Sequence, residues 1–385
     1  MDSQERLTQF GQRLLRARKA AGLSMKTLAG QVGLSANAIK KYEHGDNMPT
    51  STNLLKLAQA LEVRTEYFFR PVNVTLERVE YRKRSGTSQA LLNQVTGDVM
   101  DQVERWAELL TLYPDSIKPV PVFALPKTLP SQVSADADIE ALAEQMRNAW
   151  ALGMNPIPDM IDTLEARGIQ VITTDVPANK KVDGLAGKVG DMPVVVISSN
   201  YPGDRQRFTL AHELGHLVLH GRLSEGLDEE KACNRFAGAF LLPEAALRQQ
   251  IGTHRNAIEP RELYMLKHEF GVSMMAILVR LRQCGVISEA LYKQTLLAFN
   301  GAGWRTKEPG DPYPQEQTIL FEQLVYRALS EWYIGESKAA ELLGQSLSHF
   351  HRERKLGGMD AFAHRPEPHP AGYTASAQSG RLSRH

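Results

Sequence analysis

The feature that most constrains this chain is the sequence His212-Glu213-x-x-His216, which lies in a segment with helical spacing of apolar residues. Residues four positions apart share one face of a helix, so the two imidazoles can bind the same metal ion. Glu213 lies about 100° further round that helix, where its carboxylate can reach a water molecule beside the ion. We expect Thr209 to cap the start of this helix and Gly221 to end it.

A third metal ligand is expected in the next helical segment of the sequence. Catalytic zinc sites usually have three protein ligands and leave a fourth position for water. Glu230 and Asn234 share a helix face, so Glu230 can bind the ion while Asn234 accepts a hydrogen bond from the ring N–H of a ligating histidine. Glu229 points about 100° away and is the weaker candidate. His220 is a competing ligand. It lies two turns beyond His212, where its side chain has rotated away from the shared helix face, which favours a supporting position behind the ligands.

The two segments together resemble the ImmA/IrrE family of metallopeptidases. The resemblance rests on three runs, Arg-x-Arg-Phe-Thr-Leu-Ala-His-Glu-Leu-Gly-His ending at His216, Glu-x-x-x-Asn-x-Phe-Ala beginning at Glu230, and Leu241-Leu242-Pro243. It implies a zincin-like peptidase domain that binds one Zn²⁺ per chain through His212, His216 and Glu230. It also implies that Glu213 is the catalytic base.

The sequence offers candidates for the oxyanion-stabilising group and for the substrate-binding strand of such a peptidase. Hydrolysis of a peptide bond is helped by a group that stabilises the oxyanion, and Tyr201, Tyr264 and Arg280 are equally placed for that role. An edge strand beside the metal could hold an extended substrate by backbone pairing. The candidate for that strand is Gly184 to Lys188.

Length and composition limit the class of protein. A chain of 385 residues is too long for one ordinary domain, and 42% hydrophobic with 23% charged residues is typical of globular proteins. The sequence has no apolar run of membrane-spanning length and no secretory signal. Cys233 and Cys284 cannot make a disulfide framework. We therefore expect a cytoplasmic, nucleoid-associated protein without a membrane partner.

The positive charge of the chain is concentrated near its N-terminus. Residues 1–84 contain 15 Lys/Arg and 8 Asp/Glu, a net charge of +7, whereas the whole chain carries +1. A basic segment on a nearly neutral chain indicates a nucleic-acid module joined to another domain.

Residues 5–71 have the spacing of five short helices. They resemble the Xre/Cro-type helix-turn-helix on the following residues: Leu28-Ala29, Val32-Gly33-Leu34-Ser35, Ile39, Tyr42-Glu43-His44-Gly45, Pro49, Leu54, Leu57-Ala58 and Leu61.

The second helix of such a motif enters the major groove of DNA. The resemblance implies a double-stranded DNA operator bound by a homodimer. Asn37 could contact an adenine and Lys41 a guanine or a phosphate, while the start of the preceding helix lies against the DNA backbone. A helical protein-interaction domain of the same fold is the alternative. The predicted DNA-contacting residues are Ser24, Met25, Lys26, Ser35, Ala36, Asn37, Lys40 and Lys41.

The predicted fold class is α+β, mainly helical with a small sheet. The predicted parts are a helix-turn-helix domain at 5–71, a strand, long helix and Pro-rich connector at 72–134, a metallopeptidase domain at 135–300, a C-terminal helical segment at 315–360, and a disordered tail at 361–385. The long helix, from Ser88 to about Tyr113, either pairs with its copy in a dimer or packs on the peptidase domain. The C-terminal helices, with the basic residues 351–355, either add a contact to DNA or a partner or form a docked tail.

The combination predicts a transcriptional regulator whose repression is relieved by proteolysis of itself or of a partner regulator. The alternative is an antitoxin-like or ligand-sensing regulator, in which the peptidase fold binds a protein such as a toxin without turnover. A housekeeping peptidase with an incidental helix-turn-helix is a third interpretation.

Overall fold

The computed structural model describes residues 3–61, 63–69, 77–83, 89–175, 182–189 and 191–355. The chain divides into two compact units, residues 1–333 and 334–385. The predicted disordered tail lies outside the described residues. None of the described helices is long and apolar enough to cross a lipid bilayer.

The N-terminal part of the first unit is a five-helix domain, as the sequence predicted. Its elements are α1 (Ser3–Ala20), α2 (Met25–Val32), α3 (Ala36–Glu43), α4 (Ser51–Ala60) and the 3-10 helix η1 (Thr65–Phe69). Ser24, Ser35 and Thr50 cap α2, α3 and α4 by accepting a backbone N–H with the side-chain hydroxyl. Gly33, at φ 70°, ends α2 in the left-handed conformation and makes the tight turn into α3. The buried core includes Phe10, Leu14, Leu28, Ala29, Val32, Ile39, Leu57 and Phe68.

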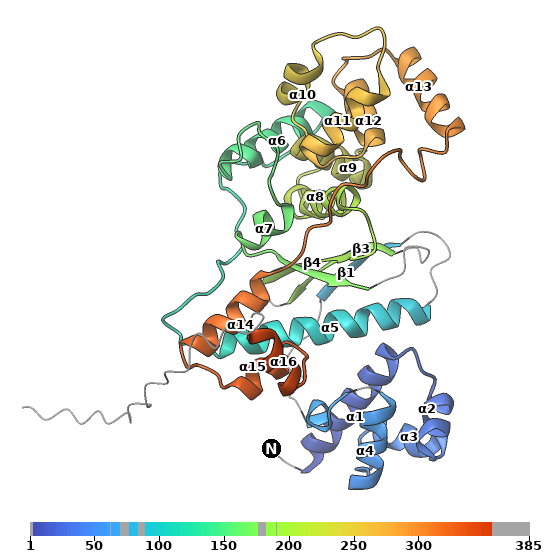
Figure 1. Cartoon of the computed structure of the whole chain (residues 1–385), viewed down its shortest axis with the longest axis vertical. Helices are drawn as coiled ribbons and strands as arrows, with labels where there is room; N and C mark the ends of the chain where they lie inside the picture. The colour runs from blue at the N-terminus through green and yellow to red at the C-terminus, as the bar shows by residue number, and fades with distance from the viewer. Residues whose placement is uncertain are drawn as a thin grey trace, which may run out of the picture. The chain divides into compact units, whose positions relative to one another are not determined.

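The sheet of the first unit has four strands in the order β1-β3-β4-β2 (Figure 1). The strands are β1 (Glu77–Lys83), β2 (Gln170–Thr174), β3 (Val182–Val189) and β4 (Met192–Ser198). β1 is antiparallel to β3, β3 is antiparallel to β4, and β2 is parallel to β4.

The expectation that Gly184 to Lys188 forms an open edge strand is wrong. These residues belong to β3, which is paired on both sides, because β1 takes the edge position with Arg82 opposite Gly184 and Glu77 opposite Lys188. The sequence predicts a strand at the start of residues 72–134, where β1 lies, but the pattern of a strand does not reveal its partner.

The sheet is covered by different helices on its two faces (Figure 1). Successive residues of a strand point to opposite faces. Val194 and Val196 of β4 pack with α5 (Gln89–Thr111), whereas Val195 and Ile197 pack into the larger core that contains α8 (Gly203–Leu219). The long helix therefore packs on the sheet of its own chain.

The larger core joins α8 to the remaining helices of this part. They are α6 (Asp136–Ala149), α7 (Met160–Glu165), α9 (Glu229–Leu241), α10 (Glu244–Ile251), α11 (Pro260–Phe270), α12 (Met274–Gln283) and α13 (Glu289–Gly301). Leu263, Phe270 and Ile277 are fully or nearly fully buried, so α11 and α12 close this core. The first unit also contains α14 (Leu320–Ser330), and the second contains α15 (Glu336–Leu342) and α16 (Leu347–Arg354).

Helix α8 begins at Gly203, so the expected cap at Thr209 is wrong. Thr209 is buried within the helix, six residues after its start. The chain at Tyr313 and Pro314 lies against that start, where the N–H of Gly203 donates to the carbonyl of Tyr313 at 3.1 Å. A Cβ at Gly203 would lie 1.7 Å from the carbonyl oxygen of Pro314. The contact that fixes the helix start therefore comes from residues more than a hundred positions away.

Candidate metal centre and nucleic-acid interface

Helices α8 and α9 bring the two predicted ligand segments together. A close approach is possible because Gly215, between the two histidines, has no side chain. A Cβ there would lie 3.2 Å from the Cα of Cys233 and 3.2 Å from a ring carbon of Phe236, both on α9. The spacing of the two helices at the histidines thus depends on one glycine.

The ligand atoms of His212, His216 and Glu230 converge on one point, and all lie within 4.8 Å of one another. The Nε2 atoms of the two histidines are 3.1 Å apart, and each lies 3.4 Å from a carboxylate oxygen of Glu230. Ligand atoms of a tetrahedral zinc ion with bonds of about 2.0–2.1 Å are separated by about 3.3–3.4 Å. Two imidazole nitrogens and one carboxylate at these separations fit a zinc ion with a fourth position left open.

The other ring nitrogen of each histidine faces an oxygen atom. The Nδ1 of His212 lies 3.1 Å from the Oδ1 of Asn234, and the Nδ1 of His216 lies 3.2 Å from a carboxylate oxygen of Glu229. A carboxylate accepts hydrogen bonds and cannot donate them, so the proton of His216 belongs on Nδ1 and its Nε2 keeps a lone pair. The amide oxygen of Asn234 favours the same tautomer for His212. Both rings are thereby arranged to offer Nε2 to a metal.

Sequence reasoning missed the contact made by Glu229. In the sequence Glu229 is only a weaker alternative to Glu230 as a ligand, because adjacent helix residues point about 100° apart. Because the two side chains point in different directions, Glu230 lies between the two histidines while Glu229 contacts the Nδ1 of His216. The presence of two consecutive acidic residues at the start of the ligand helix was the available signal.

Glu213 lies beside the ligands on α8 and is 3% exposed. His212 is fully buried, whereas the side chain of Glu230 is 62% exposed. The site is therefore closed on the α8 side and open to solvent on the α9 side. His220 is exposed at the end of α8 and does not belong to the converging group.

The three oxyanion candidates lie in different surroundings. The ring of Tyr201 is covered by the guanidinium of Arg205, whose Cζ lies 3.8 Å from the ring centroid. The hydroxyl of Tyr264 accepts a hydrogen bond from the N–H of Asp311 at 3.3 Å. Arg280 is 1% exposed and is engaged by Glu140 through both terminal nitrogens, at 2.7 and 3.0 Å. The expectation of Arg280 as an oxyanion donor is therefore replaced by a structural role.

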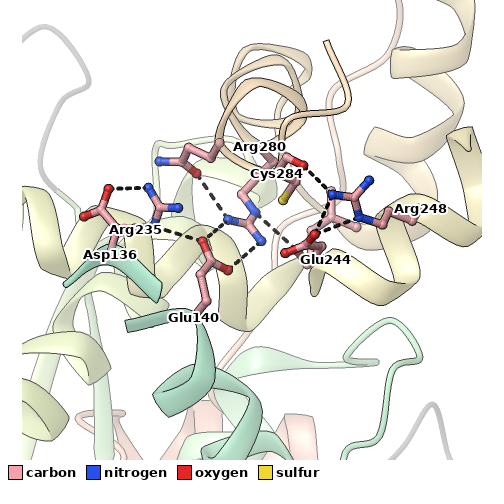
Figure 2. A network of polar contacts seen from close by, with 9 residues as sticks. Asp136, Glu140, Arg235, Glu244, Arg248, Arg280 and Cys284 are labelled. Atoms are coloured by element: carbon pink, nitrogen blue, oxygen red, sulfur yellow. Dashed lines mark hydrogen bonds and ion pairs between the residues drawn. The ribbon is translucent and has the colours of Figure 1, made fainter. Parts of the chain in front are cut away.

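That role is to hold α9 from its outer side (Figure 2). Glu140 of α6 contacts both Arg280 of α12 and Arg235 of α9, and Arg235 also forms an ion pair with Asp136 at 2.8 Å. Gly238 makes room for this arrangement, because a Cβ there would lie 2.8 Å from the side chain of Arg280. The network ties α9, the helix that carries Glu230, to α6 and α12. Figure 2 also shows the neighbouring contacts of Glu244, Arg248 and Cys284.

The helix-turn-helix presents its predicted contact residues to solvent. Ser24, Met25 and Lys26 at the start of α2, and Ser35, Ala36, Asn37, Lys40 and Lys41 along α3, are all exposed. The hydroxyls of the two serines accept backbone N–H groups at 3.0 and 3.1 Å, so they also fix the starts of the helices. Sequence reasoning missed the buried ion pair between Arg18 of α1 and Glu43, which holds the far end of α3.

Comparison with known proteins matches two separate families to the chain. The family described as "IrrE N-terminal-like domain" matches residues 164–282, and the family described as "Helix-turn-helix" matches residues 14–68. The chain joins a helix-turn-helix domain to an IrrE-type domain. The IrrE-type domain contains α8 and α9 with the converging ligands, and the helix-turn-helix domain contains α2 and α3.

Several similar proteins are transcriptional regulators. The chain is 42% identical over 52 residues to the cryptic phage CTXphi transcriptional repressor RstR of Vibrio cholerae serotype O1, which is 14% of this chain and 46% of the repressor. It is 42% identical over 59 residues to an uncharacterised transcriptional regulator in the ATPase CF(0) region of Rhodospirillum rubrum, 15% of this chain and 55% of that protein. The chain thus spans about half the length of these relatives. The crystal structure of the restriction-modification controller protein C.AhdI from Aeromonas hydrophila matches with 41% identity over 16% of this chain and 96% of C.AhdI, at a TM-score of 0.16.

Proposed function

We propose that the chain is a DNA-binding transcriptional regulator whose IrrE-type domain is a zinc-dependent endopeptidase that relieves repression by cleaving the chain itself or a partner regulator. The observation that carries this proposal is the convergence of His212, His216 and Glu230 at tetrahedral separations, with Glu213 beside them. The operator is double-stranded DNA, and the homologous repressor of V. cholerae supports a repressor role for the N-terminal domain.

The residues of this chain divide the chemistry among them. His212, His216 and Glu230 would hold one zinc ion, which supplies a Lewis acid and lowers the pKa of a bound water to near 7. The carboxylate of Glu213 accepts the proton of the attacking water and returns it to the nitrogen of the departing amine. Asn234 and Glu229 keep the imidazoles in the tautomer that presents an unprotonated Nε2 to the metal position.

Cleavage of the chain between its two domains would relieve repression. The helix-turn-helix ends at η1, and the elements of the IrrE-type domain begin after α5. Cleavage between Phe69 and Gln89 would separate most of the basic N-terminal segment from the rest of the chain. Operator affinity would fall if dimerisation or positioning depends on the remainder.

The proposal is tested with Glu213→Gln, which removes the base and preserves the size of the side chain. The purified full chain is loaded with one equivalent of zinc and incubated, and the masses of the intact chain and of any fragments are followed with time, alone and with a candidate partner regulator. We expect the wild type to yield fragments only with zinc, and the variant to bind zinc and operator normally but to yield none. Derepression of a reporter that proceeds unchanged with Glu213→Gln would remove proteolysis from the mechanism.

A second candidate function is a ligand-sensing or antitoxin-like regulator in which the IrrE-type domain binds without turnover. The position of β1 favours it, because this strand covers β3, which contains the segment expected to pair with an extended substrate. Under this function the zinc-loaded wild type and Glu213→Gln would respond alike to a protein partner, and neither chain would produce fragments.

A further inference from the structure

The second unit repeats the local structure of the helix-turn-helix. Helix α16 has eight residues, like α3, and each begins after a capping serine, Ser346 and Ser35. The preceding turns each contain a left-handed glycine two positions before that serine, Gly344 at φ 69° and Gly33 at φ 70°. Two segments far apart in the sequence thus have the same helix–glycine–serine–helix spacing.

The hydrogen bonds of the two turns also correspond. In the first, the N–H of Leu34 donates to the carbonyl of Ala29 at 2.9 Å, and in the second the N–H of Gln345 donates to the carbonyl of Ala340 at 2.9 Å. Each pair closes the end of the first helix across its glycine in the same way. The angle at which the chain leaves the first helix is fixed by this bond together with the glycine.

The starts of the second helices match as well. The hydroxyl of Ser35 accepts the N–H of Ala38 at 3.1 Å, and the hydroxyl of Ser346 accepts the N–H of His349 at 3.2 Å. Buried residues stand at corresponding places of the two motifs, so each second helix buries one face and exposes the other. These pairs are Leu28 and Ala339, Ala29 and Ala340, and Ile39 and Phe350, all at most 3% exposed.

The exposed face of α16 carries basic side chains at the positions where α3 carries them. His351 and Arg352 stand at the positions of Lys40 and Lys41, and both are exposed. Arg354 and His351 each contact Glu336 of α15, at 2.6 and 3.1 Å, which holds the two helices in a fixed relation. From Leu347 to Lys355 the charges are Arg352, Arg354 and Lys355 against Glu353.

We propose that α15 and α16 form a second helix-turn-helix, which binds the phosphate backbone of double-stranded DNA through Arg352 and Lys355. A polyanion fits this surface better than a protein partner, because the exposed positions of α16 are polar or basic apart from Leu347. Each chain then has two DNA-contacting helices, α3 and α16. The inference does not depend on zinc chemistry, so it stands or falls separately from the peptidase.

The test compares two double variants of the full chain that each remove one arginine and one lysine. Arg352→Ala with Lys355→Ala changes α16, and Arg305→Ala with Lys307→Ala removes the same charge from exposed positions of the first unit. Binding to a fluorescent random-sequence duplex is measured by anisotropy over a series of salt concentrations. Each lost phosphate contact lowers the slope of log affinity against log salt by about one. We expect the slope to fall by about two for the α16 variant and to stay unchanged for the control.

Repeating the measurement in a variant of α3 shows whether the contribution of α16 to DNA binding is independent of α3. In the variant Lys40→Ala with Lys41→Ala, the duplex affinity that remains should fall again when the two α16 substitutions are added. Thermal unfolding of each variant verifies that the surface substitutions leave the fold intact. An α16 variant whose salt slope equals that of the wild type, or a control with the same loss, overturns the proposal. An unchanged slope together with weaker binding of a protein partner would assign the surface to that partner instead.

Discussion

The hydrogen bonds behind the two histidines make a sharp prediction about metal affinity. Asn234→Ala removes the acceptor of the His212 ring N–H, and Glu229→Ala removes that of His216. The two changes are chemically similar but differ in their surroundings. His212 is fully buried, whereas 14% of the His216 side chain and 52% of the Glu229 side chain are exposed.

The size of each effect follows from access to water. A buried N–H without its acceptor costs about 1–3 kcal/mol, and the middle of that range is roughly a 30-fold loss of zinc affinity. Replacement of residues that support metal ligands usually costs about 10- to 100-fold. Water can replace the carboxylate of Glu229, so we expect a loss of only about threefold there.

The assay is a competition for zinc between the apoprotein and a chromophoric chelator of known affinity. Asn148→Ala on the exposed surface of α6 is the matched control for the first change, and it should bind zinc like the wild type. The reasoning is refuted if Asn234→Ala keeps an affinity within about twofold of the wild type. It is also refuted if Glu229→Ala causes the larger loss, because burial would then not set the order of the two effects.

Three further changes have expected outcomes. Gly215→Ala forces α9 away from α8 by a few tenths of an ångström, and we expect about tenfold weaker zinc binding in the same competition assay. Glu140→Ala removes the carboxylate that pairs with the buried Arg280 and with Arg235, at a cost of about 3–5 kcal/mol, which should lower the melting temperature of the first unit by about 6 °C. Burial, with the nearby Asp162 as a lesser cause, raises the pKa of Glu165 to about 8 from 4.5. Between these two pKa values the folded state keeps a proton that the unfolded state releases. The contribution of Glu165 to the free energy of unfolding is therefore fully present below about pH 4.5, and it falls by about 5 kcal/mol as the pH rises to about 8. Glu165→Gln should raise the melting temperature near pH 8 and leave it nearly unchanged near pH 5, and equal shifts at both pH values would contradict this assignment.

The sequence predicted what depends on local spacing. His212 and His216 share a face because they are four positions apart, and the helix-turn-helix follows from its capping serines and glycine. The sequence did not show what Glu229 contacts, because that depends on the distance between α8 and α9. The open edge at Gly184 was also wrong, because the pairing of β1 with β3 joins segments about a hundred positions apart.

Helix α5 connects the DNA-binding part of the first unit to its sheet, and this connection bears on how cleavage would act. One face of α5 packs on β2 and β4, and its Glu104 forms a largely buried ion pair with Arg13 of α1. A Cβ at Gly97 would lie 2.5 Å from the Cβ of Ala20, so the backbones of α1 and α5 also lie close together.

A cut between Phe69 and Gln89 would therefore break the chain without breaking these contacts. Dissociation of α1 from α5 returns both charges of this ion pair to water, so the pair itself adds little net free energy, and the close packing of the two helices is the main contact that holds a cleaved domain in place. If cleavage within the chain relieves repression, the rate of relief depends on dissociation of α1 from α5 as well as on the rate of hydrolysis. In that case the cleaved domain would leave the rest of the chain only when the packing of α1 on α5 is lost.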